Sequence, residues 1–372
     1  MVALLGAGCV ATDPAPSGEL PTYPAGAMLR VPAEWEPQEA IWLQWPRAAE
    51  RSYEPALARV VATIVRYEDV HVLVHDASTR RSALAALTEI GGLDADVATG
   101  AASPEGFTIT WHDVPNDNAW MRDNGPRYVL VDGALRLQNW AFDAWGGGFG
   151  RVPFRQDDAV PNAVGEILGL PVDPVGVVHE RGDLEFNGED AVLLNWSVIG
   201  DPARNPGMTR ERAIQAMQTS FGVERVVLLE GVPMGDATRG HVDGIARFVD
   251  ADTVVVADCS QGSHCAPGGP DDRVYDDAAA RIAAAGFEVV RFPFLAAVPY
   301  RDAVFDTDYM NWLVGNGFVI TVGFGHAEAD RDAEARLREW FPGRDVYVIE
   351  MLESWYAGGG VHCHTNDQPR WP

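Results

Sequence analysis

The chain has 372 residues, a length that suits one large α/β domain or two ordinary ones. Hydrophobic residues make up 47% of it and charged residues 22%, so a sizeable core is available and extensive disorder is excluded. With 28 Lys and Arg against 54 Asp and Glu, the formal net charge of −26 gives no basis for binding nucleic acid or anionic lipid. Such a chain attracts cations, including small basic molecules, although solubility or a salty habitat is the simpler reason for the charge.

The N-terminus looks like the end of a bacterial lipoprotein signal. Met1–Cys9 is apolar and rich in small residues, with Cys9 as the residue that would carry the lipid, but the basic start of a signal is missing. A cytoplasmic segment without fixed structure is the alternative. Residues 11–27 are rich in Pro, Thr, Ser, Gly and Ala, which predicts a flexible tether. We therefore expect a signal remnant and tether over 1–27, a single domain over 28–372, and an exported or lipid-anchored location in preference to a cytoplasmic one.

Five helix-then-strand units follow one another along the chain. They pair residues 54–66 with 70–74, 159–168 with 175–178, 208–221 with 225–229, 275–285 with 287–292, and 327–340 with 345–349. Helices that alternate with short β-branched strands predict an α/β architecture. A repeated module around an axis is one interpretation, and an open doubly wound sheet is the other. No glycine-rich phosphate loop follows a strand, so a nucleotide cofactor is not indicated.

Three cysteines follow the tether. Cys259 and Cys265 bracket a tight polar loop, which can close as a disulfide and would then agree with export; two unrelated thiols are the alternative. Cys363 is left without an obvious partner and is the candidate free thiol.

Polar and glycine-rich segments mark the candidate site. They cover residues 116–126, 179–185, 240–244 and 358–364. In the last of them, Gly358-Gly-Gly-Val-His-Cys363 can present a sulfur at a pocket, and a thiol becomes a strong nucleophile when a positive neighbour or a base activates it.

His241 is the candidate partner of that thiol. If Gly240-His-Val-Asp-Gly244 is extended, His241 and Asp243 lie on one face and point into one pocket, although a histidine satisfied by a nearby carboxylate is the structural alternative. Asp123 and Glu180 also lie near glycines, and buried carboxylates are costly unless they are paired. Several carboxylates around one Cys and one His favour a cationic substrate. Guanidinium is the best candidate, because its planar fork of donors matches carboxylates.

These residues carry a family resemblance. The sequence resembles the agmatine deiminase and bacterial-type peptidylarginine deiminase family, within the guanidine-modifying pentein superfamily. The ordered matches are Val31–Pro46, Trp120–Pro126, Ala144–Gly147, Asn205–Gly207, Gly240–Asp243, Ala246–Phe248, Tyr309–Asn311, Gly359–Cys363, Thr365 and Gln368–Pro369. Each match is weak alone, and their order over nearly the whole of 28–372 is specific.

The resemblance implies an α/β propeller of five modules around a central site, with pseudo-five-fold symmetry, and a single catalytic deiminase domain. It implies that Cys363 is the nucleophile, His241 the general acid and base, Asp123 and Asp243 the guanidinium-binding pair, and Glu180 the carboxylate that positions the histidine. The implied reaction converts agmatine, arginine or peptidyl arginine to the ureido product and ammonia through a covalent thiouronium, with no metal or organic cofactor.

Two departures from the family pattern bear on the substrate. Arg181 stands where the family has glycine, and Arg239 where it often has an acidic residue. Two arginines near the pocket fit agmatine poorly and could bind the carboxylate of free arginine or of a C-terminal arginine, unless they face solvent. Further expected substrate contacts are Trp120, Arg122, Trp145 and Gly360, although both tryptophans are also ordinary core residues.

Two other classes of protein compete with this interpretation. A zinc hydrolase could use His241, Asp243, His362, Cys363 and His364, but neither Cys-x-x-Cys nor His-Glu-x-x-His spacing supports it. A binding protein could hold a cation without turnover, but binding alone needs neither the thiol nor the imidazole.

Overall fold

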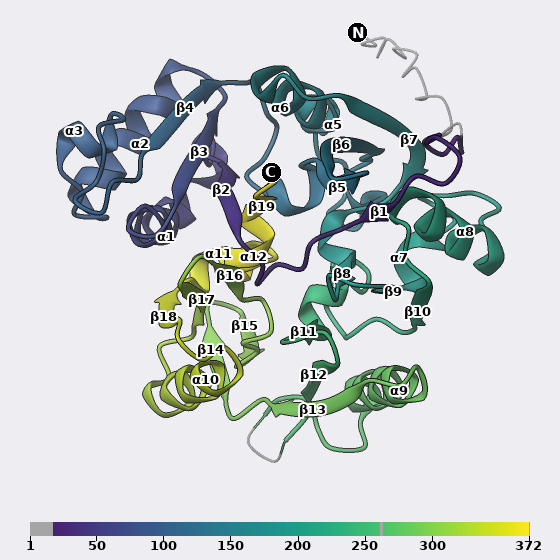
Figure 1. Ribbon diagram of the computed structural model, residues 1–372. Coiled ribbons are helices and arrows are strands. Elements are labelled where there is room, and N and C mark those ends of the chain that lie inside the picture. Colours follow the sequence, from purple (N-terminus) through teal and green to yellow (C-terminus); the bar gives the residue numbers. More distant parts are fainter. Residues whose placement is uncertain (1–17, 261–262, 372) are drawn as a thin grey trace, which may run out of the picture.

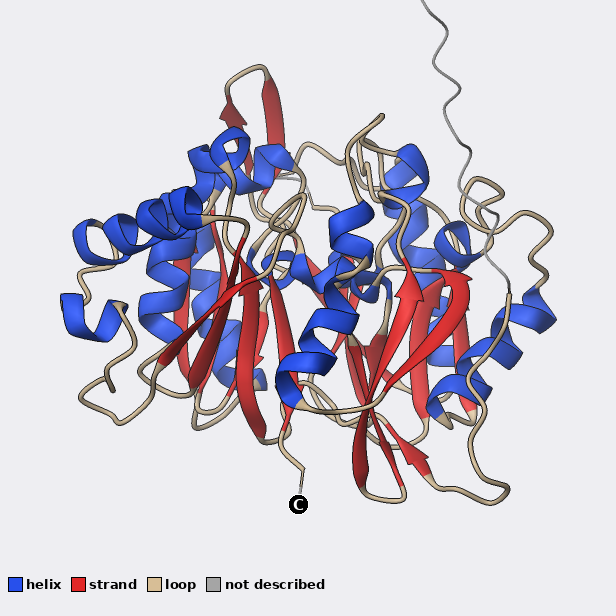
Figure 2. Ribbon diagram, turned by 90° about the horizontal axis from the view of Figure 1, so that it is seen from above, coloured by secondary structure: helices blue, strands red, loops and turns tan. Residues whose placement is uncertain are grey.

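The computed structural model describes residues 18–260 and 263–371, and the predicted lipid-bearing Cys9 lies outside them. The chain has a mixed α/β fold in which the sheets are grouped around the middle of the molecule and helices lie outside them (Figure 1). From above, the strands form an inner layer with helices beside it (Figure 2). Among the described helices, none combines the length and apolar composition needed to cross a bilayer.

One pattern of strand pairing recurs in five sheets. Two antiparallel neighbours are followed by one or more helices and then by a strand parallel to the second neighbour. The first two sheets contain β1 (Leu29–Arg30), β5 (Arg127–Val131), β6 (Ala134–Ala141) and β7 (Val172–Val178), and β8 (Glu185–Phe186), β9 (Ala191–Asn195) and β10 (Arg225–Leu229). The next two contain β11 (Ala246–Phe248), β12 (Thr253–Asp258) and β13 (Glu288–Pro293), and β16 (Leu313–Gly315), β17 (Phe318–Gly323) and β18 (Asp345–Glu350). The fifth contains β19 (Thr365–Pro369), β2 (Gln38–Gln44), β3 (Asp69–Val74) and β4 (Ile109–Asp113). A separate hairpin joins β14 (Ala297–Tyr300) to β15 (Ala303–Asp306).

The longer helices connect these strands. They are α1 (Glu54–Ile64), α2 (Ala77–Glu89), α6 (Val160–Leu168), α8 (Arg210–Phe221), α9 (Pro270–Ala284) and α10 (Ala327–Trp340); the short ones are α3 (Ala95–Ala98), α4 (Met121–Asn124), α5 (Arg155–Asp158), α7 (Trp196–Ile199), α11 (Leu352–Ala357) and α12 (Val361–His364), with 3-10 turns η1 (Ala48–Tyr53), η2 (Trp145–Gly147), η3 (Arg181–Asp183) and η4 (Val242–Gly244).

The module β17–α10–β18 shows why these residues form these elements. Every residue of β17 is buried, as expected for a Val- and Ile-rich strand that is covered on both faces. In α10, Ala329, Ala333 and Leu337 recur every fourth position and are the buried residues, while the charged remainder faces outward. The β17 and β18 strands are then parallel, as a helical crossover requires.

All five predicted helix-then-strand units are present, with shifted bounds. The unit predicted to start at Tyr275 begins earlier, at Pro270, because Pro suits the first turn of a helix and acidic residues follow it there. The strands are divided among separate sheets and do not form the single open sheet that was the alternative.

Strands from near the two ends of the chain pair with each other. Strand β19 pairs antiparallel with β2, and this pairing places α12 and Cys363 in the interior (Figure 1). Cys363 is buried and free, whereas Cys259 and Cys265 form the predicted disulfide. The disulfide lies beside the β14–β15 hairpin, because the Cys265 backbone N–H donates to Asp306 at 2.9 Å.

Candidate active site

A pocket of about 620 Å³ brings together residues from distant parts of the chain. Cys363, His241 and Asp243 all line it, and they come from α12, from the residue before η4 and from η4 itself. Asn311 and Asp308, which precede β16, line it as well. A nucleophile, an imidazole and acidic groups therefore share one chamber.

The Cys363 sulfur is held by two neighbours. Its Sγ atom lies 3.1 Å from Nδ2 of Asn311 and 3.7 Å from Oδ2 of Asp243. Gly359 is required beside it, because a Cβ there would lie 2.8 Å from the sulfur. Burial, together with the charges of Asp243 and Asp123, raises the pKa of the Cys363 thiol well above its usual value. The Cys363 thiol is therefore neutral in this environment.

His241 lies between two carboxylates. Its Nδ1 atom is 3.6 Å from Oδ1 of Asp123, and its Nε2 atom is 3.5 Å from Oε2 of Glu180. Burial disfavours the charged ring, but Asp123, Glu180 and Asp243 outweigh it and raise the pKa of His241 to about 10. An imidazolium that can donate a proton therefore stands in the pocket at neutral pH. Gly182 passes close by, since a Cβ at this position would lie 2.6 Å from the His241 ring.

Glu180 is fixed by an arginine from a distant loop. Arg204 donates from Nε to Oε1 of Glu180 at 2.9 Å, and both side chains are fully buried. Burial favours the neutral acid, but Arg204 and His241 outweigh it and lower the pKa of Glu180. Sequence reasoning missed Arg204, although it directly precedes the matched Asn205–Gly207 segment.

Asp123 belongs to the one-turn helix α4. Its Oδ2 atom accepts a hydrogen bond from Nε1 of Trp145 at 2.8 Å, and its Oδ1 atom accepts one from the Gly182 backbone at 3.2 Å. Burial raises the pKa of Asp123 to about 6, with His241 opposing and Asp243 adding to the shift. Trp145 has a φ of 60°, which is uncommon for a bulky residue and aims its indole at this carboxylate.

Asp243 is held in place by Asn311 and His362. Its Oδ2 atom accepts from Nδ2 of Asn311 at 3.1 Å and lies 2.8 Å from Nδ1 of His362. The prediction of an extended segment over residues 240–244 is wrong for residues 242–244, which form a 3-10 turn. His241 itself keeps an extended backbone conformation just before that turn, so both side chains still reach the same pocket.

The arginines expected near the substrate are paired with carboxylates. Arg181 lies 2.7 Å from Asp367, and Arg239 lies 2.5 Å from Asp201. The buried Arg122 lies 2.6 Å from the same Asp367 carboxylate. Within residues 18–260 and 263–371, the lining of the pocket includes none of the three arginines.

The two remaining expected contacts pack against residues next to the thiol, Gly359 and Asn311. Trp120 is buried and stacks on His364 with ring centroids 4.2 Å apart. Gly360 has no room for a side chain, because a Cβ would lie 2.3 Å from Val322 and 2.7 Å from Oδ1 of Asn311. Among the described lining residues, neither Trp120 nor Gly360 is included.

The pocket has acidic lining residues besides the catalytic ones. They are Asp236, Asp271, Asp306 and Asp308, and no arginine is found among the described lining residues. Burial raises the pKa of Asp308 to about 7, and Asp306 adds to the shift. The lining of the pocket therefore suits a second positive charge and opposes a carboxylate.

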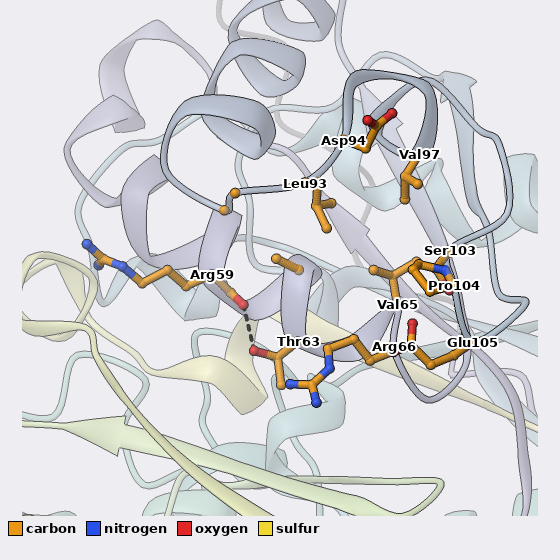
Figure 3. Close-up of a pocket in the computed structure, with 13 residues that line it drawn as sticks. Arg59, Thr63, Val65, Arg66, Leu93, Asp94, Val97, Ser103, Pro104 and Glu105 are labelled. Atoms are coloured by element: carbon orange, nitrogen blue, oxygen red, sulfur yellow. Dashed lines mark hydrogen bonds between the residues drawn. The ribbon is translucent and has the colours of Figure 1, made fainter.

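Other features of the described residues do not form a comparable site. A cavity of about 530 Å³ beside α1 is lined by Arg59, Arg66 and Asp94 among others, but by no described cysteine or histidine (Figure 3). The group found close enough to hold a metal ion is Asp258, Asp272 and Asp276, which includes none of the ligands of the zinc-hydrolase alternative.

Sequence reasoning overlooked several residues around the thiol. Asn311 and Glu34 lie inside matched segments, and His362 was considered only as a zinc ligand. Nothing in the sequence distinguishes Asp308 from an ordinary solvent-exposed aspartate in a loop. The structure brings these residues together from strands and loops that are far apart in sequence.

The fold and this site define a guanidine-modifying class of enzyme, and the comparisons identify the family. The family model for Porphyromonas-type peptidyl-arginine deiminase matches residues 30–369, so the chain belongs to that family. The chain is 29% identical to the agmatine deiminase of Stutzerimonas stutzeri, over 91% of this chain and 95% of that protein.

Solved structures agree with the assignment. The agmatine deiminase of Enterococcus faecalis superposes with a TM-score of 0.77 and 25% identity, covering 92% of this chain and 96% of that one. A cysteine-to-serine variant of the C. jejuni agmatine deiminase with substrate bound gives a TM-score of 0.80 at 18% identity, covering 94% and 99% of the two chains, and so supports the fold.

Proposed function

We propose that this protein hydrolyses the guanidinium group of a small cation to a ureido group and ammonia, with agmatine as the preferred substrate. The observation that carries the proposal is the shared pocket of Cys363, His241 and Asp243, with Asp123 3.6 Å from the His241 ring. Membership of the deiminase family and the named agmatine deiminases among its relatives support the same chemistry.

In the first half-reaction, Asp123 and Asp243 bind the guanidinium and hold its central carbon over Cys363. The bound cation offsets the two aspartates that raise the thiol pKa, so substrate binding releases the thiol proton to solvent. The thiolate then forms an S–C bond to the guanidinium carbon. The His241 imidazolium gives its proton to the departing nitrogen, which leaves as ammonia, and a thiouronium remains on Cys363.

In the second half-reaction, His241 acts as a base. The ring is neutral after its proton has left with ammonia, and it takes a proton from a water molecule that attacks the same carbon. The S–C bond of the tetrahedral intermediate breaks, its hydroxyl proton passes to solvent, the neutral ureido product leaves and Cys363 returns as a thiolate. Asn311, which lies 3.1 Å from the sulfur, stabilises that thiolate with a hydrogen bond.

The acidic lining of the pocket, beyond the catalytic residues, favours agmatine over arginine. Agmatine carries an ammonium at its far end, and Asp308 with its acidic neighbours would bind it. Free arginine or a C-terminal arginine carries a carboxylate that these groups would repel. The pairing of Arg181 with Asp367 and of Arg239 with Asp201 leaves both arginines neutralised, which supports the same choice.

The repeated strand pairing supports a five-module propeller as the arrangement behind this site. Each module would contribute loops to the centre. The catalytic groups lie in the connections that follow the last strand of four of the five sheets: Asp123 after β4, Glu180 after β7, His241 and Asp243 after β10, and Cys363 after β18. This organisation also supports the expectation of one catalytic domain over 28–372.

The test offers agmatine, free arginine and peptides with internal or C-terminal arginine to the purified protein. Ammonia release is measured, and mass spectrometry detects the replacement of NH by O in the product. We expect rapid conversion of agmatine and slow or no conversion of the others. Preferred conversion of arginine or an arginyl peptide would overturn the substrate choice, and no conversion with Cys363 reduced would overturn deimination itself.

A further inference from the structure

We propose that His362 and Glu34 are positioning residues of this site, which act through Asp243. In this arrangement His362 holds the Asp243 carboxylate in place and ionised, and Glu34 holds the opposite side of the His362 ring. The inference rests on the proposed function, because it assigns a purpose to groups that do not themselves touch the guanidinium.

The geometry of His362 sets it apart from the other buried histidines. Its Nδ1 atom lies 2.8 Å from Oδ2 of Asp243, and its Nε2 atom lies 2.8 Å from Oε2 of Glu34. A carboxylate can only accept hydrogen bonds. Burial, with the charges of Arg122 and Arg247, lowers the pKa of His362 well below its usual value, so the ring is neutral and has one N–H, which the positioning role places on Nδ1 toward Asp243. The ring is also the residue directly before Cys363, and its own backbone N–H donates to Oδ1 of Asn311 at 3.1 Å.

Glu34 is anchored by groups outside the pocket. Its Oε1 atom accepts from the Val314 backbone at 2.7 Å, and its Oε2 atom lies 3.2 Å from Nη2 of Arg247 and 3.7 Å from Nη2 of Arg122. These contacts keep Glu34 in one place. The N-terminal segment before β2 therefore supplies a fixed acceptor behind the active site.

The contact with His362 affects the ionisation and orientation of the Asp243 carboxylate. Burial alone would raise the pKa of its carboxyl, but the hydrogen bond from His362, together with the charges of His241 and Arg247, outweighs burial and lowers it. The bonds from His362 and Asn311 also occupy Oδ2, which leaves Oδ1 to meet the substrate. Without the imidazole, Asp243 would be a buried carboxyl with one fewer donor, so it would hold its proton to higher pH and bind a cation less well.

The test measures agmatine binding by calorimetry in the Cys363→Ser background, where turnover is blocked, across about pH 5 to about pH 9. We expect His362→Phe to weaken agmatine binding roughly tenfold to a hundredfold, as for loss of a hydrogen bond to a charged group. The fall in affinity at low pH, the acid limb of the binding curve, should move to higher pH. His362→Gln should recover part of the affinity, because its amide can donate to Asp243. Glu34→Gln should move the limb in the same direction by less.

His71→Gln is the matched control. His71 is half-buried on β3, where its Nδ1 atom lies 2.8 Å from His112, and it does not line the pocket. Its loss should lower the melting temperature without moving the acid limb of binding. If His362→Phe does not fold, His362→Gln and Glu34→Gln decide the outcome. Unchanged affinity and an unchanged acid limb in the folded variants would overturn the positioning role.

Turnover assays of the wild type and of the same variants with Cys363 intact separate this inference from the proposed function. A wild-type protein that neither binds nor deiminates agmatine contradicts the proposed function, whatever the variants do. A wild-type protein that deiminates agmatine, with His362 and Glu34 variants that match it in kcat, KM and pH profile, contradicts only the positioning role.

Discussion

Glu180 and Arg204 form a fully buried ion pair, with Nε of Arg204 2.9 Å from Oε1 of Glu180. The arginine keeps the carboxyl ionised despite its burial, and the other carboxylate oxygen lies 3.5 Å from Nε2 of His241. Arg204 thus keeps Glu180 negatively charged beside the imidazole that must donate a proton. Asp123, Glu180 and Asp243 together raise the pKa of His241 to about 10 despite its burial, so the ring is an imidazolium at neutral pH.

Glu180→Gln tests that relationship. The amide keeps the shape but removes the negative charge, so we expect the pKa of His241 to fall from about 10 and kcat to drop. General acid catalysis is typically worth roughly a hundredfold or more, which sets the scale of the loss. The alkaline limb of the pH–rate profile should move to lower pH. An alkaline limb that stays in place would show that Glu180 does not control His241, and melting curves would separate this from loss of folding.

Cys363→Ser separates binding from chemistry. The hydroxyl is a much weaker nucleophile than a thiolate, so ammonia release should fall below detection, whereas Asp123 and Asp243 should still bind the cation. Binding is measured by calorimetry, and a covalent adduct is sought by mass spectrometry after rapid acid quench. The wild type should show the adduct and the variant should not. Turnover by the variant at more than a trace of the wild-type rate would remove Cys363 from the nucleophile's role.

Much of the fold and of the catalytic set could be predicted from local sequence. The helix in residues 327–340 follows from apolar residues at every fourth position, and Cys363 and His241 stand in glycine-flanked polar segments, a pattern typical of active-site loops. Arg204 and Glu34 could not be found in this way, because their partners lie far away in sequence and only the tertiary fold brings them together. The same holds for the pairing of Arg239, since charge alone does not reveal which carboxylate an arginine meets.

Asp308→Asn tests the proposed site for the second positive charge. We expect weaker binding of agmatine, by roughly tenfold for one lost ion pair in a partly buried site, and little change for butylguanidine, which lacks the ammonium. Asp302→Asn is the control, because Asp302 is exposed on the β14–β15 turn and its carboxylate accepts from the Tyr356 hydroxyl at 2.6 Å. Equal losses for both ligands would mean that Asp308 supports the pocket without binding the ammonium.

Stability should depend on pH in opposite ways with and without a cation in the pocket. The pKa values of Asp123 and Asp308 are raised to about 6 and about 7, so both acids favour the folded state at low pH and lose that contribution as pH rises through these values. Agmatine favours their ionised forms. The rise in melting temperature that agmatine gives the Cys363→Ser protein should therefore be larger at about pH 8 than at about pH 5. Asp123→Asn should remove part of this difference and Asp308→Asn a further part, and a larger rise at the lower pH would contradict the assignment of these carboxyls to the cation.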